Sequence, residues 1–247
     1  MNDGLRVAAI GDLHVTVHGA GPLADLIARA RDAVQALVLC GDLTEHGLPE
    51  EARVLAAELR AARTPIVAVL GNHDYEAGRQ GEIAAILREA GVRILDGESV
   101  ELGEIGFAGA KGFAGGFGDR ALEPWGEEAI KNFVREAVDE SLKLGSALAK
   151  LRTPHKVVVL HYSPVIDTVV GEPPEIYAFL GSTRLAEPID RYGASAVVHG
   201  HAHCGAAEGR TRAGIPVYNV SLPLLRRAFG EAAPLRILDL APAVATR

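Results

Sequence analysis

Aspartate, asparagine and histidine residues stand directly after five short apolar segments of this 247-residue chain. The candidate donors, in chain order, are Asp12, His14, Asp42, Asn72, His161, His201 and His203. Mixed carboxylate and imidazole donors favour transition metals such as Mn, Fe, Co or Zn over Mg or Ca. Seven donors exceed what one tetrahedral ion takes, but they suit two ions about 3.5–4 Å apart that share a bridging carboxylate. The spacing therefore predicts a centre of two transition-metal ions.

The apolar segments that precede these donors are short and rich in β-branched residues, which is typical of buried strands. They are Leu5–Ile10, Ala36–Cys40, Ile66–Leu70, Val157–Leu160 and Ala194–Val198. Helical patterns at Pro22–Arg31 and Pro49–Arg63 separate the first three, which predicts a βαβαβ unit with parallel strands. Because ligands bind beyond the carboxyl ends of such strands, we expect the donors to converge. Glycines directly before the donor motifs permit tight turns and a close approach.

The remaining sequence shows no linker long enough to divide it, which indicates a single domain over residues 1–247. Further helices are expected over 79–90, Glu127–Lys150 and, as the one helix of a β-rich C-terminal third, near Arg184–Tyr192. Hairpins are expected between Val92 and Gly109, and later strands near Gly205–Thr211, Pro216–Val220 and Leu235–Leu240. The glycine-rich stretch Gly112–Gly126 is predicted to be a flexible loop, either a flap that faces substrate or a tolerant surface loop.

The ordered motifs resemble the signature of the calcineurin-like metallophosphoesterases. The motifs are Gly11-Asp12-x-His14, Gly41-Asp42, Gly71-Asn72-His73-Asp74, His161 and Gly200-His201-x-His203. The resemblance spans residue 5 to about residue 220 and implies an α/β (mixed α+β) fold. The expected architecture is a four-layer αββα sandwich, with two mixed β-sheets flanked by helices.

The resemblance also implies a role for each motif residue. One metal ion would be held by Asp12, His14 and His203. The other would be held by Asn72, His161 and His201, with Asp42 as the bridge between the two. His73 would lie beside the scissile oxygen as the catalytic residue, protonating the leaving group or stabilising transition-state charge. Asp74 would either orient His73 or act as a turn residue.

Other reactive side chains are predicted to have no catalytic role. Strand alternation directs His199 away from the ligands, and His18 and His46 are expected to be exposed loop histidines. The two cysteines, Cys40 and Cys204, lack CxxC spacing and are expected to be buried thiols in a reducing compartment.

Composition limits the class of partner. A formal charge of −7 and only 5% aromatic residues disfavour a broad nucleic-acid surface. No apolar run approaches the ~18–20 residues that span a bilayer, and no secretion signal is visible. A cytoplasmic protein with a small phosphoester substrate is expected, with no membrane or stable nucleic-acid partner. The oligomeric state stays open.

These observations predict a dinuclear-metal-dependent phosphoesterase. It would hydrolyse phosphomonoesters or phosphodiesters of small soluble molecules, nucleotides included, by attack of a metal-activated hydroxide. A single-strand nuclease and a non-catalytic scaffold of the same fold are the alternatives. The motifs position metals and phosphate rather than the leaving group. They leave open the substrate, the choice between mono- and diesters, and the choice between Mn, Fe and Zn.

Overall fold

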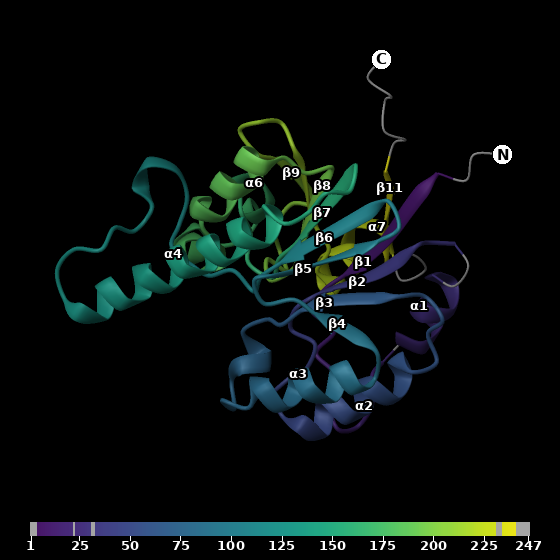
Figure 1. Cartoon of the computed structure of the whole chain (residues 1–247). Helices are drawn as coiled ribbons and strands as arrows, with labels where there is room; N and C mark the ends of the chain where they lie inside the picture. Colours follow the sequence, from purple (N-terminus) through teal and green to yellow (C-terminus); the bar gives the residue numbers. More distant parts are fainter. Residues whose placement is uncertain (1–3, 22, 31–32, 231–233, 241–247) are drawn as a thin grey trace, which may run out of the picture.

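Two β-sheets form the centre of the molecule in this computed structural model, which describes residues 4–21, 23–30, 33–230 and 234–240 (Figure 1). The first sheet, in spatial order, consists of β11 (Arg236–Leu240), β1 (Leu5–Ile10), β2 (Ala36–Cys40), β3 (Ile66–Val69) and β4 (Val92–Ile94). The second consists of β5 (Glu98–Leu102), β6 (Ile105–Gly109), β7 (His155–Val159), β8 (Ala196–His199), β10 (Pro216–Asn219) and β9 (Glu208–Arg210). Both sheets are mixed, because β11, β5 and β9 pair antiparallel at the edges while the other neighbouring strands run parallel.

Helices cover the outer face of each sheet, which gives the expected four layers. The helices are α1 (Leu23–Ala30), α2 (Pro49–Leu59), α3 (Gln80–Glu89), α4 (Glu128–Leu148), α5 (Tyr177–Leu180), α6 (Ala186–Tyr192) and α7 (Leu222–Phe229). In Figure 1, α1, α2 and α3 lie together below the first sheet, whereas α4 and α6 lie beside the second sheet on the opposite side. The contacts between α4 and both β5 and β6, and between α4 and α6, agree with this arrangement.

Successive residues of β7 pack against different layers. Val157 and Val159 join the core between the two sheets, while Val158 and Leu160 pack with Leu144 of α4. Since both faces of the strand are buried, apolar residues occupy consecutive positions instead of alternating with polar ones. The first polar side chain after the strand, His161, therefore emerges at the edge where the sheet ends.

The predicted strands before the donor motifs are all present; β1 and β2 have the predicted bounds, and the ends of β3, β7 and β8 differ by at most two residues. They belong to two sheets, since β1, β2 and β3 are in the first and β7 and β8 in the second. The helices expected over 79–90 and Glu127–Lys150 correspond to α3 and α4. Pro22 and Arg31, at the ends of the first predicted helix, lie outside the described residues. The Gly112–Gly126 stretch is irregular apart from a short 3-10 turn at Gly118–Arg120.

Two sequence predictions are wrong. The C-terminal third contains α7, and the single turn α5, in addition to the predicted helix. The eight residues of α7 are short for a periodic signal, and the helix begins with a proline in its first turn that resembles a loop residue. Cys204 is exposed rather than buried, because it lies in the loop after β8, whereas Cys40 is buried within β2. Within the described residues, no helix is long and apolar enough to cross a membrane.

Candidate metal centre

The seven predicted donors come together where strands of the two sheets end. The first sheet supplies Asp12, His14, Asp42 and Asn72, and the second supplies His161, His201 and His203. Donors from the two sheets are in direct contact: His203 Nε2 lies 2.9 Å from Asp12 Oδ1, and His161 Nε2 lies 2.8 Å from Asn72 Oδ1. Asp42 stands between the groups, with its carboxylate 3.4 Å from His161 Nε2 and 3.9 Å from His14 Nε2.

Among the residues that the structure describes, three clusters of potential ligand atoms lie here; two consist only of predicted donors, and the third joins His14 to Glu45 and His73. Asp12, His14 and His203 each offer an atom within 4.8 Å of the others, and so do Asp42, His161 and His201. These clusters match the two ligand sets that the sequence resemblance implied, with Asn72 beside the second. The structure thus brings every predicted metal ligand into one place.

The backbone at four of these donors is strained. Asp12, His14, Asp42 and His201 have φ between 47° and 69°, and among the described residues they are the non-glycine residues with positive φ. For an L-residue this left-handed conformation costs about 1–2 kcal/mol. Such strain concentrates where side chains are held for a function rather than for stability.

Glycines beside the donors leave room for neighbouring ligands, as the sequence analysis expected. A Cβ atom on Gly41 would collide with the ring of His161. A Cβ on Gly71 would collide with the carboxylate of Asp42, and one on Gly200 with that of Asp12. Any larger residue at these positions would therefore displace a predicted metal ligand.

Backbone carbonyl groups set the orientation of two imidazoles in the clusters. His161 Nδ1 lies 2.9 Å from the carbonyl oxygen of Cys40, and His201 Nε2 lies 3.2 Å from that of Phe179. Because a carbonyl oxygen only accepts, each of these ring nitrogens carries the proton. In His201 the other nitrogen, Nδ1, keeps a lone pair for a metal ion. In His161 the other nitrogen, Nε2, faces oxygens of Asn72 and Asp42 and would release its proton when an ion binds.

The electrostatics of the site fit a cation. Burial opposes charge on His161 and Asp42, but their mutual attraction prevails, so the pKa of His161 rises to about 9 and that of Asp42 falls below its ordinary value. Burial lowers the pKa of His201 to about 4. Both ring nitrogens of His14 are buried without a hydrogen bond, although Glu45 Oε2 lies 3.1 Å from Nδ1. Buried carboxylates and unbonded imidazole nitrogens are the groups that a divalent metal ion would satisfy.

His73 lies at the edge of this centre. Its backbone N–H donates to Asp42 Oδ1 at 2.9 Å, and its ring meets that of His14 edge-on with the centroids 4.6 Å apart. His73 Nδ1 lies 2.7 Å from the carbonyl oxygen of Glu45, so Nδ1 carries a proton. The side chain is 35% exposed, which leaves it open to a substrate.

Asp74 bonds to the backbone of two loops rather than to the ring of His73. Its fully buried carboxylate accepts hydrogen bonds from the N–H groups of Leu43, Thr44 and Gly71 and from the Thr44 hydroxyl. Burial raises the pKa of Asp74 to about 6, so it is ionised at neutral pH. Of the two roles considered for Asp74, the structure favours the loop residue, and the carbonyl of Glu45 orients His73 instead.

A comparison with protein families shows which family has this sequence pattern. The sequence model of the calcineurin-like phosphoesterase family matches residues 5–205. The chain belongs to the calcineurin-like phosphoesterases. Members of this family use metal ions, and the two donor clusters are candidate sites for them.

Solved structures share the fold of this calcineurin-like phosphoesterase. A phosphopantetheinyl hydrolase from Mycobacterium tuberculosis matches over 100% of both chains with a TM-score of 0.68 and 18% identity. The protein TT1561 of Thermus thermophilus matches over 96% of this chain and 99% of its own, with a TM-score of 0.55 and 15% identity. A structure named as a 5′-nucleotidase from Staphylococcus aureus matches over 87% and 48%, with a TM-score of 0.50 and 14% identity. The comparison with curated proteins finds no match.

The remaining histidines of the phosphoesterase take the places that the sequence predicted. His199 is fully buried and bonds to the Gly200 carbonyl and the Thr168 hydroxyl, each at 2.8 Å. His18 and His46 are exposed in loops. Sequence reasoning missed Glu45, whose carbonyl meets His73 and whose carboxylate meets His14. Its position three residues after Asp42, in the same loop, was the available signal.

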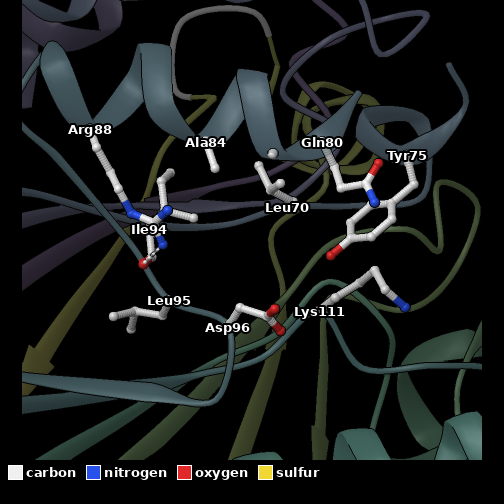
Figure 2. A pocket seen from close by; sticks show the side chains of 10 residues that line it. Leu70, Tyr75, Gln80, Ala84, Arg88, Ile94, Leu95, Asp96 and Lys111 are labelled. Carbon is white, nitrogen blue, oxygen red and sulfur yellow. Dashed lines mark hydrogen bonds between the residues drawn. The ribbon is translucent and has the colours of Figure 1, made fainter. Parts of the chain in front are cut away.

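A separate cavity of about 170 Å³ lies behind the His73–Tyr75 turn of the phosphoesterase, between α3 and the ends of β3 and β4 (Figure 2). Figure 2 shows the ring of Tyr75 beside Gln80, with Lys111 beneath. The buried Lys111 amine donates to the Gly112 carbonyl at 2.8 Å, and it lies over the ring of Tyr75. None of the predicted metal ligands lines this cavity, so it is distinct from the metal centre.

Proposed function

We propose that this protein is a phosphoester hydrolase that works with two transition-metal ions, Mn, Fe or Zn. The convergence of two histidine and aspartate clusters at the junction of the two sheets carries the proposal. One ion would be held by Asp12, His14 and His203. The second would be held by Asn72, His161 and His201, with Asp42 bridging. When bound, such ions neutralise the charge of the phosphoryl oxygens and activate a water molecule as the nucleophile.

The charge of the donor set suits an anionic substrate. Two divalent ions would bring four positive charges against the two carboxylates of Asp12 and Asp42. A phosphoester would then be attracted locally, although the whole chain carries a formal charge of −7. The same negative surface favours a small phosphoester over a nucleic acid, whose backbone needs a broad basic surface.

His73 would assist departure of the leaving group. With Nδ1 donating to the Glu45 carbonyl, Nε2 is the nitrogen available to the substrate. In its protonated form, Nε2 would hand a proton to the leaving alkoxide, or it would stabilise the negative charge there. The backbone N–H of His73 donates to Asp42, and this bond holds His73 next to the residue that would bridge the metal ions.

A hydrolysis panel on metal-stripped protein reloaded separately with Mn, Fe, Zn or Mg tests the proposal. The panel contains simple mono- and diesters, cyclic nucleotides, a 5′-nucleotide, a phosphopantetheine ester and single-stranded DNA. The 5′-nucleotide and the phosphopantetheine ester are included because proteins of those names share the fold. We expect metal-dependent hydrolysis of small esters. Cleavage of DNA alone would indicate a nuclease, and no hydrolysis with any metal would indicate a scaffold.

A further inference from the structure

A short segment without positive charge is packed directly against the predicted metal ligands. We call residues 166–180 the rim segment. Its buried residues Val169 and Leu180 form a small apolar cluster with Ala202, which lies between the ligands His201 and His203. The packing is close, because a Cβ atom on Gly171 would collide with the Cys204 carbonyl. The rim segment therefore forms one wall beside the metal centre.

Phe179 connects the rim segment to the site most directly. Its carbonyl oxygen accepts the 3.2 Å hydrogen bond from His201 Nε2, while its side chain is 58% exposed. The ring lies 6.3 Å, between centroids, from that of Phe133 on α4. From there a series of ring contacts through Phe113 and Tyr162 returns to His201. A series of aromatic side chains, exposed at Phe179 and buried at Tyr162, thus begins next to a predicted metal ligand.

Three further apolar side chains of the rim segment are exposed. Ile166, Val170 and Ile176 are 39–55% exposed. Single exposed apolar residues are ordinary, but several in one short segment beside a functional centre indicate a contact surface.

The charges of the rim segment itself disfavour a polyanionic partner. Asp167, Glu172 and Glu175 are its charged residues, and it has no lysine or arginine. Arg227 of α7 reaches the neighbouring loop, but its guanidinium donates to the carbonyl oxygens of His203 and Gly205. A substrate carrying further phosphates or carboxylates would meet repulsion beside Glu172 and Glu175, whereas Arg210 and Arg212 share a pocket with Ile166 and Asp167 at the start of the segment.

We propose that the rim segment, and Phe179 in particular, receives the organic group of the substrate, and that this group is uncharged and apolar, an alkyl or aromatic alcohol. The inference rests on the proposed phosphoesterase function, because a phosphoryl group held at the metal centre would leave its ester group to lie along an adjoining wall. It assigns the rim segment as the part of the chain that determines substrate preference.

A series of n-alkyl phosphates from methyl to hexyl, with the Mn-loaded protein, tests this inference. Alkyl alcohols of this series have nearly the same pKa, so chain length reports contact rather than leaving-group reactivity. Full burial of a methylene group would raise kcat/KM about fourfold. Because this wall is partly open to solvent, we expect about half of that free energy, a rise of about twofold per methylene. In Phe179→Ala the hexyl-to-methyl ratio of kcat/KM should fall about tenfold, and Phe179→Leu should retain an intermediate ratio.

The matched control is Leu142→Ala, which removes an equally exposed apolar side chain from α4. Leu142 lies roughly 13 Å along the helix from Phe133, and its removal should leave the ratio unchanged. An equal loss for all esters in Phe179→Ala would mean that the residue acts only through His201, and it would overturn the inference. Equal rates for all chain lengths in the unaltered protein, or preference for glycerol phosphate over the hexyl ester, would overturn it as well.

Failure of the proposed function would look different. If the unaltered protein hydrolyses methyl phosphate but shows no chain-length dependence, only the assignment of the rim segment fails. If it hydrolyses no ester with any metal, the phosphoesterase function fails and this inference fails with it. Binding to phosphatidylcholine vesicles that is lost in Phe179→Ala, without any chain-length dependence, would assign the rim segment to a lipid surface instead.

Discussion

Three histidines at the centre are oriented by hydrogen bonds to backbone carbonyl oxygens. His73, His161 and His201 each direct one ring nitrogen toward a backbone carbonyl oxygen. Since a carbonyl cannot donate, the interaction selects one tautomer and fixes which nitrogen faces the site. A backbone acceptor is retained whatever side chain stands at that position. The orientation of these rings is therefore set by chain geometry, while the charge of His161 also depends on the side chain of Asp42.

For His73, this orientation leads to a prediction at the residue scale. His73→Ala should lower kcat by about 10²-fold or more, because the leaving group loses its proton donor. The metal content, measured by mass spectrometry, should stay near that of the unaltered protein, since His73 is not assigned as a ligand. His46→Ala, which removes an exposed histidine of a neighbouring loop, is the control and should keep full turnover. Normal turnover in His73→Ala would contradict the catalytic role.

At the scale of elements, the carboxylate of Asp74 bonds to both the loop after β2 and the loop after β3. Asp74 accepts from the backbone of Leu43 and Thr44 in one loop and of Gly71 in the other. These loops carry Asp42 and Asn72. Asp74 therefore fixes the relative position of the two loops that carry these predicted ligands. It is not itself a predicted ligand.

Removing this carboxylate should destabilise the fold. Asp74→Ala leaves three buried N–H groups without an acceptor, and we expect a loss of about 3 kcal/mol or more in the free energy of unfolding. For a chain of this size that corresponds to a fall in Tm of roughly 10 °C. Urea and thermal unfolding would measure it, with the exposed Asp139→Ala of α4 as control. A loss under about 0.5 kcal/mol, as surface substitutions give, would show that the loops hold together without Asp74.

At the scale of the whole molecule, the centre lies where two sheets meet, and Asp42 spans them. It follows β2 of the first sheet, yet its carboxylate lies 3.4 Å from His161, which follows β7 of the second. The burial of this acid is balanced by the histidine beside it, which lowers the pKa of Asp42 despite the cost of desolvation. A metal ion on either side would replace that protonated histidine as the compensating charge.

Asp42→Asn should therefore reduce metal occupancy at both sites. The amide removes the negative charge that the two ions would share, and we expect fewer than one full ion at each site after reloading with Mn or Zn and dialysis. Elemental analysis of the protein gives the stoichiometry. Asp239→Asn, which changes an exposed acid on β11, should keep the occupancy of the unaltered chain. Two tightly bound ions in Asp42→Asn would refute the bridging role.

The positions of the donors were predictable because each follows directly from local sequence. A buried parallel strand reads as a continuous apolar run, and the polar residue that ends the run lies at the carboxyl edge of the sheet. Asp12, Asp42 and His161 were identified in this way. Glycines before the donors were also informative, because the structure shows that a side chain at Gly41 or Gly71 would overlap a neighbouring donor.

Only the tertiary structure decided which groups support these donors. The carbonyl oxygen of Cys40 bonds to His161, which lies 121 residues later in the sequence. The carboxylate of Asp74 accepts hydrogen bonds from backbone N–H groups about 30 residues earlier. Backbone carbonyl and amide groups occur at every residue and leave no mark in the sequence, so their pairing depends on how loops from two sheets come to face one another. The exposure of Cys204 and the wall formed by Phe179 depend on the same packing. The sequence by itself determined which residues are candidate donors, and the packing of the two sheets determined their orientation and the surface that a substrate would meet.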